Sequence, residues 1–325
     1  MQTISSTIQD LHLGQAETFE GLTLIPLFGS TLREPDYLTL DQALEQKLAR
    51  VLEVSEGGSV PNLLFENLGD RKVLLVDGDE LVGAKQNRII NLTILVAAHS
   101  KIEIPVSCVE AGRWRYDSEE FDSRKRSMFS RARAAKTDNV TARMRTSGER
   151  YSEQTEVWEN IAACSMCLDV DSETGSMGDL YDQQEERIKG YREAFQAQDG
   201  QVGAVFAVNG AVQGVEYFDS PAPFRQYLDR LVGSYAVEAM LEPDASAPVM
   251  ADESVKAFLE QVTQAGSESY AALGLGEDLR LSGEALAGGA LLAEERIVHL
   301  AAFRLDPSEE DEDENVLHFR NRPVH

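Results

Sequence analysis

The chain has 325 residues, of which 42% are hydrophobic and 26% are charged, an ordinary composition for a globular protein. Its formal net charge of −26 argues against non-specific binding to nucleic acid or to an anionic membrane. We expect a cytoplasmic protein, because no apolar run is long enough to span a bilayer, the N-terminus MQTISSTIQD lacks the features of a signal peptide, and three cysteines cannot form a disulfide framework.

The first third of the chain is rich in predicted strands. Apolar residues between Leu44 and Leu52 recur at helical spacing, which predicts an early helix. The segment Val73–Val82 has two apolar arms around an Asp-Gly pair, and this pair supplies the positive φ angles of a two-residue hairpin turn. Apolar residues then alternate from Ile102 to Cys108, so we expect Cys108 to be a small buried residue and not a nucleophile.

The middle of the chain, from about residue 116 to 200, is polar and predicted to be helical. Apolar residues from Leu180 to Phe195 indicate one long helix. Cys164 and Cys167 have the spacing of half a zinc site, but no second cysteine or histidine pair accompanies them. Two small residues in a helix is the better account of this pair.

The last third mixes strands and helices to about residue 305. Two further hairpins are predicted at Val205–Val215, around an Asn-Gly pair, and at Leu291–Leu300. The run Asp219-Ser220-Pro221 is a helix start, and a second helix follows at 255–262. The strongly acidic tail from Asp306 cannot bury apolar surface, so we expect it to be disordered.

This order of elements favours an α+β fold, with largely antiparallel hairpins and sheets, a helical middle segment and packed helices. Neither a GxGxxG nor a GxxxxGK[ST] loop occurs, so no cofactor is expected. A metal held by carboxylates stays open, because such sites leave little spacing signature.

The charge is unevenly distributed. From Arg113 to Arg150 there are eleven basic and six acidic residues, a net charge of +5, so the rest of the chain carries −31. The basic segment can be a solvated helix or loop, can bind an anion such as phosphate, or can dock against acidic surface of the same chain or of a second copy. The sequence leaves these alternatives open.

A dense group of polar residues follows the 73–82 segment. Lys85 and Arg88 can neutralise a phosphate, and arginine offers a planar fork for two bonds. The amides of Gln86, Asn87 and Asn91 carry the donors and acceptors that a ribose, base or amide ligand requires.

Glu80 precedes this group, and Ser107, Glu110 and Arg113 follow a strand later. Glu80 can orient Lys85, accept from a sugar hydroxyl or act as a general base. The alternative is a polar network that closes a sheet edge or bulge, with Gly83 at the bend.

The same segments carry a family resemblance. The phrases DGDELVGAKQNRIIN (77–91) and IPVSCVEAGRW (104–114) resemble signature motifs of the ADP-ribosylglycohydrolase- and rhodanese/phosphatase-associated protein domain, ARPP. The segments 203–224 and 287–303 also resemble its pattern, and the resemblance extends from about residue 10 to 305.

The resemblance implies a single ARPP-like domain at 10–305, with the acidic tail 306–325 outside it. The order of predicted elements suggests lobes 10–115 and 200–305 within this domain, with the Arg-rich helical segment 116–200 between them. It implies a link to NAD and ADP-ribose metabolism through genomic association, without an established reaction. The positions that it favours as site residues are Glu80, Lys85, Gln86, Asn87, Arg88, Asn91, Ser107, Glu110 and Arg113.

Two hypotheses follow. In the first, the protein binds a phosphorylated ribonucleotide such as ADP-ribose or an NAD derivative. If it is also an enzyme, it is a hydrolase in which Glu80 or Glu110 acts as general base while Lys85 and Arg88 stabilise negative charge. In the second, it is a protein interaction module without small-molecule chemistry. Whether it forms a homo-oligomer stays open.

Overall fold

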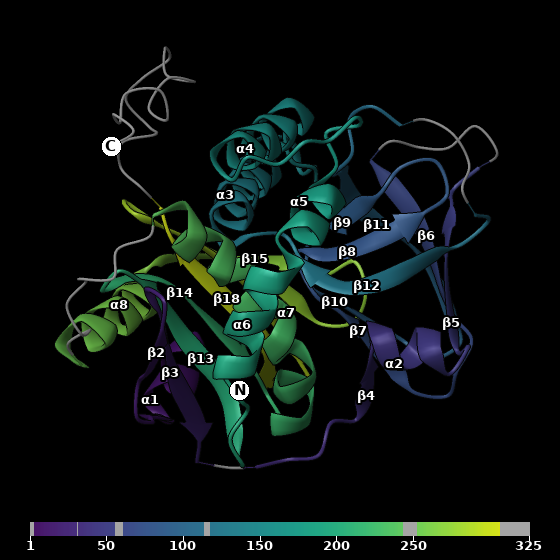
Figure 1. Ribbon diagram of the computed structural model, residues 1–325. Helices are drawn as coiled ribbons and strands as arrows, with labels where there is room; N and C mark the ends of the chain where they lie inside the picture. The colour runs from purple at the N-terminus through teal and green to yellow at the C-terminus, as the bar shows by residue number, and fades with distance from the viewer. Residues whose placement is uncertain (1–2, 31, 56–60, 114–117, 243–251, 306–325) are drawn as a thin grey trace.

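The computed structural model describes residues 3–30, 32–55, 61–113, 118–242 and 252–305 of the chain. It confirms the α+β class, because mostly antiparallel strands form two groups of sheets and helices pack between and around them (Figure 1). No helix within these ranges is long and apolar enough to cross a membrane. The acidic tail, for which we expected disorder, lies outside the described residues.

Among the described strands, nine form one large sheet. Its order is β1-β3-β13-β14-β18-β17-β16-β15, and β2 pairs with β3. The strands are β1 (Leu11–Leu13), β2 (Glu17–Phe19), β3 (Leu22–Gly29), β13 (Gln201–Val208), β14 (Ala211–Phe218), β15 (Gly266–Ala271), β16 (Glu277–Gly283), β17 (Leu286–Ala293) and β18 (Arg296–Arg304). Segments from both ends of the chain therefore share this sheet.

Two of the three predicted hairpins are confirmed in the large sheet. Strands β13 and β14 pair across Asn209 and Gly210, whose φ angles are +49° and +78°. Strands β17 and β18 pair across Glu294 and Glu295, whose φ angles are +49° and +65°. Both turns have the two positive φ angles that match the twist of a hairpin.

Helices cover both faces of the large sheet. Helices α1 (Ile4–Gln9) and α8 (Asp252–Gln264) bury their apolar residues against one face. Helix α7 (Pro221–Leu241) packs on the other face. It begins after Ser220 with Pro221 as its first residue, as predicted, but the capping side chain expected before the proline makes no hydrogen bond to this end of the helix.

The remaining strands and α2 (Leu40–Glu45) form a small lobe. One sheet has the order β12-β8-β9-β11-β6-β5 and the other has the order β10-β7-β4. The strands are β4 (Tyr37–Thr39), β5 (Ala49–Glu53), β6 (Asn62–Asn67), β7 (Lys72–Leu75), β8 (Asp79–Gly83), β9 (Arg88–Ile90), β10 (Ile94–Val96), β11 (Ser100–Cys108) and β12 (Phe121–Ser127).

The hairpin predicted at Val73–Val82 is wrong. Strand β7 pairs with β10 and β4, whereas β8 pairs with β9 and β12, so the Asp77-Gly78 turn carries the chain from one sheet into another. Gly78 has the expected positive φ of +86°. An Asp-Gly turn reverses the chain, but it does not determine which strand each arm pairs with.

Two helix predictions need correction. The stripe from Leu44 to Leu52 is not one helix, because α2 ends at Glu45, Lys47 is left-handed at φ +57°, and Val51 lies in strand β5. The stripe from Leu180 to Phe195 is split into α5 (Met177–Gln183) and α6 (Glu185–Ala194). In both cases apolar residues at helical spacing continue beyond the residue at which the helix ends.

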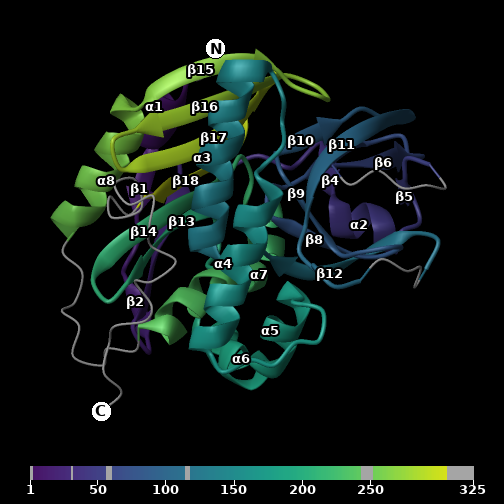
Figure 2. The ribbon, with the colours of Figure 1, turned by 90° about the horizontal axis from the view of Figure 1, so that it is seen from above.

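The middle segment, expected to be helical from about residue 116, first forms strand β12 and becomes helical at α3 (Ser130–Ser147) and α4 (Gln154–Cys167). Figure 2 shows α3, α4 and α7 between the large sheet and the small lobe. Cys164 and Cys167 lie in α4, as expected for two small residues in a helix. The described residues contain no group of three or more His, Cys, Asp or Glu side chains able to hold a metal ion.

Candidate functional site

The site residues predicted from the sequence lie on strands β8, β9 and β11 of the small lobe and on the segments that follow these strands. Glu80 lies on β8, Arg88 on β9 and Ser107 on β11, and Glu110 and Arg113 follow β11 directly. All nine predicted residues are buried, with exposed fractions of 9% or less. The structure therefore gathers them in one lobe but distributes them over separate polar contacts.

Glu110 is the centre of a buried set of contacts that we call the Glu110 network: Gln86, Asn87, Glu110, Arg113 and Thr174. The Glu110 Oε2 accepts from Arg113 Nε at 2.8 Å and from the Asn87 backbone N–H at 3.3 Å, and Oε1 accepts from the Thr174 hydroxyl at 3.1 Å. Asn87 Oδ1 accepts from Arg113 Nη2 at 2.8 Å. Gln86 Nε2 donates to the Glu110 carbonyl at 2.7 Å. The charged groups of this network are therefore paired with one another and with neighbouring polar groups.

The Glu110 network closes the turn between β8 and β9. Arg113 Nη1 donates to the Ala84 carbonyl at 3.0 Å. Gly83 marks the bend expected there, at φ +139°, and a Cβ on it would lie 2.7 Å from the Glu120 carbonyl oxygen. These contacts match the alternative of a polar network that closes a sheet bend.

Lys85 and Arg88 lie beside this network. Lys85 is 8% exposed and Arg88 is fully buried, where Arg88 Nη1 donates to Gln86 Oε1 at 3.0 Å. Burial lowers the pKa of Arg88. Cys108, the cross-strand partner of Arg88, is also fully buried, and burial raises the pKa of its thiol. It is a small core residue, as expected.

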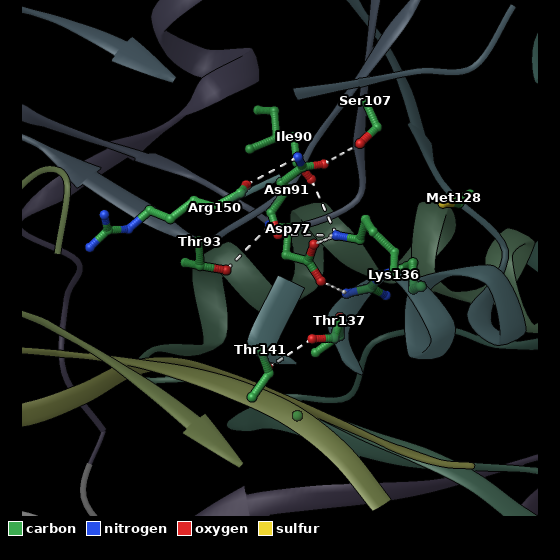
Figure 3. A network of polar contacts seen from close by, with 12 residues as sticks. Asp77, Ile90, Asn91, Thr93, Ser107, Met128, Lys136, Thr137, Thr141 and Arg150 are labelled. Carbon is green, nitrogen blue, oxygen red and sulfur yellow. Dashed lines mark hydrogen bonds and ion pairs between the residues drawn. The ribbon is translucent and has the colours of Figure 1, made fainter. Parts of the chain in front are cut away.

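Asn91 and Ser107 belong to a second set of contacts, shown in Figure 3. The Ser107 hydroxyl donates to Asn91 Oδ1 at 2.9 Å, and Asn91 Nδ2 donates to the Arg150 carbonyl at 3.4 Å. Lys136 Nζ donates to the Asn91 carbonyl at 3.2 Å and contacts the Asp77 carboxylate. Asn91 and Ser107 thus help to hold α3 against the small lobe.

Part of the basic segment docks against acidic groups of the same chain. Arg133 and Lys136 of α3 are buried, and Arg133 Nη1 donates to Glu216 Oε1 of the large sheet at 2.6 Å. Arg133 Nη2 also lies 3.7 Å from Asp77 Oδ2 in the small lobe. These two cations therefore join the large sheet to the small lobe through α3.

Glu80 differs from the other predicted residues. It is fully buried, and within the described part of the chain neither of its carboxyl oxygens has a hydrogen-bond partner. Burial raises its pKa to about 7, against the opposing effect of Arg126. A buried carboxyl group without partners calls for a physical explanation, because such groups are rare in native proteins.

A bulge in β12 lies opposite Glu80. Ser123 pairs with Leu81 and Ser127 with Asp79, so the three residues from Arg124 to Arg126 oppose the single residue Glu80. Lys125 has a positive φ of +54° within this basic bulge. Bulges re-aim side chains and are frequent next to functional sites.

The basic bulge forms one wall of a cavity of about 240 Å³, which we call the basic cavity. The other walls come from α6 and α7. The lining residues are five cations, two carboxylates and one amide: Arg124, Lys125, Arg126, Glu185, Arg192, Gln226, Asp229 and Arg230.

Arg124 differs from the other cations of the basic cavity. Lys125 Nζ lies 2.6 Å from Glu45, Arg126 contacts Asp182, and Arg192 Nη1 donates to Glu185 at 3.0 Å. Arg124 is exposed, and no hydrogen bond or ion pair to it is found among the residues that the structure describes. It is the cation with the greatest freedom to bind an anion.

Arg230 fixes α7 against the small lobe behind the cavity. Its Nη1 donates to Asp79 Oδ1 at 2.7 Å, its Nη2 contacts Asp41, and the Tyr227 hydroxyl donates to Asp79 Oδ2 at 2.7 Å. Burial raises the pKa of Asp79, and the Arg230 guanidinium opposes this effect. This buried cluster attaches the α7 wall of the cavity to the small lobe.

The basic cavity was missed as a site by reasoning from sequence. Arg124, Lys125 and Arg126 fall in the basic segment, for which anion binding was one of three alternatives. Arg192, Gln226 and Arg230 come from two helices that carry no motif. The SRKRS run was the available signal, but neither the bulge nor its partners can be read from it.

Comparison with known proteins supports one assignment. A family model described as the ARG and Rhodanese-Phosphatase-superfamily-associated Protein domain, ARPP-1, matches residues 10–303. Its name states an association with ARG and with the rhodanese-phosphatase superfamily. No curated protein and no solved structure shows detectable similarity. Since the match extends over most of the 325 residues, the chain belongs to the ARPP-1 family.

Proposed function

We propose that this domain binds a phosphorylated ribonucleotide, such as ADP-ribose or an NAD derivative, with the phosphate groups in the basic cavity. The observation that carries the proposal is the cavity of about 240 Å³ with five cationic side chains in its lining. Arginine forks suit phosphate oxygens because they donate two parallel hydrogen bonds. The family name adds support, because we take ARG in that name to stand for ADP-ribosylglycohydrolase, an enzyme that acts on ADP-ribose linkages.

The size of the basic cavity limits how much of the ligand it encloses. Pockets that bury a whole drug-sized ligand have volumes of roughly 300–1,000 Å³. A volume of about 240 Å³ suits the phosphate-bearing part of a nucleotide. The nucleoside would then extend from the cavity toward solvent, past the exposed Arg124.

In this proposal the Glu110 network supports the site from behind. Glu110 forms a β-bridge with Ser176, and the Met177 N–H donates to the Val109 carbonyl at 2.9 Å. The Gly178 carbonyl, one residue further, accepts from Arg126 Nη1 at 3.4 Å. Val109 and Glu110 thus position the start of α5, and Gly178 of α5 in turn positions Arg126 in the cavity wall.

Calorimetric titration of the purified protein with ADP-ribose, NAD and AMP tests the proposal. Arg124→Ala should weaken binding about tenfold or more, because a hydrogen bond to a charged group contributes about 1.5–3 kcal/mol. Arg225→Ala is the matched control: Arg225 precedes the lining residue Gln226 but pairs with Asp199 and does not line the cavity. Its affinity should stay at the wild-type value.

Absence of binding to all three nucleotides at millimolar concentration would overturn the proposal. It would leave the interaction module as the surviving hypothesis. Size-exclusion chromatography across ionic strength examines that alternative, because contacts between exposed charges weaken with added salt.

Hydrolysis of the bound nucleotide is a second candidate function, favoured by the state of Glu80. Glu110 is held by Arg113, Asn87 and Thr174, whereas Glu80 has a pKa of about 7 and accepts no hydrogen bond from a described residue. A pKa near the working pH suits a group that transfers protons. Glu80 does not line the basic cavity, so Glu80→Gln decides its role: if the wild type turns over ADP-ribose, a rate reduced by about 10²–10⁴-fold would identify Glu80 as a general base that reaches the substrate, and a smaller loss would not. If the wild type shows no turnover, nucleotide binding without hydrolysis is the function that remains.

A further inference from the structure

We propose that Glu80 is a positioning residue that couples anion binding in the basic cavity to proton uptake, acting through Arg126. This inference rests on the proposed function, because it requires an anion in the cavity. Glu80 would carry a negative charge while the cavity is empty and become neutral when an anion occupies it. Anion binding would therefore replace the negative charge of Glu80 near Arg126 with the negative charge of the ligand.

The geometry places Glu80 against the inner side of the cavity wall. It lies opposite the basic bulge, where three residues of β12 face one residue of β8. A Cβ built on Gly178 would lie 3.8 Å from Glu80 Oε1 and 3.8 Å from Arg126 Nη1. The carboxyl group and the guanidinium therefore share the space next to Gly178, although Glu80 itself does not line the cavity.

Glycine at position 178 leaves this space open. Arg126 donates to the Gly178 carbonyl and contacts Asp182, and it does not donate to Glu80. A carboxyl group held beside a cation, without a hydrogen bond to it, interacts with the cation through charge alone. Its protonation is therefore sensitive to any further charge that approaches Arg126.

Charged groups face Glu80 from three elements. Arg126 and Arg124 of β12 favour its ionised form, while Asp182 of α5 and Glu110 after β11 favour its neutral form. Tyr181 of α5 is also close, since Glu80 contributes to raising the pKa of that phenol. Burial is the largest influence and raises the Glu80 pKa to about 7.

An anion bound at Arg124 and Arg126 alters this balance in one direction. It offsets the two cations that favour the ionised carboxylate and adds a negative charge nearby, so the Glu80 pKa rises further on binding. The bound protein then holds more protons than the free protein around neutral pH. Linkage requires that affinity is highest below the pKa of the free protein and falls as the pH rises above it, by at most tenfold per pH unit.

Other described groups do not account for such an effect. Burial lowers the pKa of His299 to about 3, and this histidine packs against Phe218 in the large sheet. His12 lies on β1, and His99 follows β10 and contacts Asp70. None of these three residues lines the basic cavity.

The test uses two probes, ADP-ribose and inorganic sulfate, because neither changes its own charge between about pH 6 and pH 8. The dissociation constant of the wild type should rise roughly five- to tenfold over this range. Glu80→Gln should show no pH dependence and should keep the affinity of the wild type at low pH. Asp182→Asn is the matched comparison: it removes a charge that favours the neutral form of Glu80, so it should shift the pH dependence toward lower pH without abolishing it.

Calorimetry of the wild type in buffers of different ionisation enthalpy supplies a second measurement that needs no variant. It should record uptake of at most about half a proton per bound anion near pH 7, increasing toward one proton near pH 8. Binding that is independent of pH, without proton uptake, would overturn this inference while leaving the proposed function intact. If neither probe binds at any pH, the proposed function fails, and this inference fails with it. If Glu80→Gln does not fold, the proton count of the wild type decides.

Discussion

The Glu110 network and the basic cavity are both polar regions, but their charged groups have different partners. In the network, the Arg113 guanidinium is bound to Glu110, Asn87 and a backbone carbonyl, all buried. In the cavity, Arg124 is exposed beside an open space. The comparison teaches that crowding of polar residues in a sequence does not distinguish side chains that bind each other from side chains available to a ligand.

The largest expected effect concerns stability. Arg113→Met removes the cation from a buried carboxylate, which typically costs about 3–5 kcal/mol of the free energy of unfolding. Arg124→Met, in the cavity, should change it by no more than about 0.5 kcal/mol. Urea denaturation of both variants measures the contrast. Equal losses in the two variants would show that the regions do not differ as described.

A second expectation concerns Glu80 and the pH dependence of stability. The folded-state pKa of this acid is raised from 4.5 to about 7, so its contribution to stability is fully present below pH 4.5 and is lost as the pH rises through about 7. Glu80→Gln lacks this loss. Relative to wild type, the variant should therefore gain about 3 kcal/mol in free energy of unfolding between acid pH and pH 8.

Urea denaturation at a series of pH values provides this comparison. Asp182→Asn serves as the comparison, because it removes a charge that favours neutral Glu80 and should therefore shift the pH profile toward lower pH but keep its shape, whereas Glu80→Gln lacks the Glu80 titration altogether. A constant difference between Glu80→Gln and wild type at all pH values would contradict the raised pKa and weaken the proton-coupling inference.

The smallest expected effect concerns ionic strength. Because Arg124 is exposed, its attraction for an anion is screened, and the affinity for ADP-ribose should fall roughly three- to tenfold between low salt and about 0.5 M salt. Arg124→Ala should show a shallower dependence. The buried Glu110 network should be insensitive to the same change, as judged by the free energy of unfolding. A ligand affinity that salt leaves unchanged would argue against a site built on exposed charge.

Local signals predicted parts of the fold well. The Asn209-Gly210 turn and the Ser220-Pro221 helix start depend on the conformations of adjacent residues, and the structure confirms both. The turn at Gly78 was also predicted, but the partners of its two strands were not, because strand pairing depends on residues far apart in the chain.

The candidate site was less accessible to sequence reasoning. Glu80 was singled out, and its burial without hydrogen bonds makes it unusual among the predicted residues, but its relation to Arg126 depends on a bulge. Arg192 and Arg230 reach the basic cavity from α6 and α7, two helices more than fifty residues from β12 in the chain. No spacing rule connects residues whose proximity is created only by the packing of helices on sheets.

The contacts of α3 with both sheet groups bear on how the protein unfolds. Arg133 is bound to Glu216 of the large sheet, and Lys136 is bound to Asp77 of the small lobe. Separating the lobes would leave buried ions without their counter-ions, at a cost of several kcal/mol for each. We therefore expect one cooperative transition in calorimetry, and neither lobe expressed alone should retain a stable core.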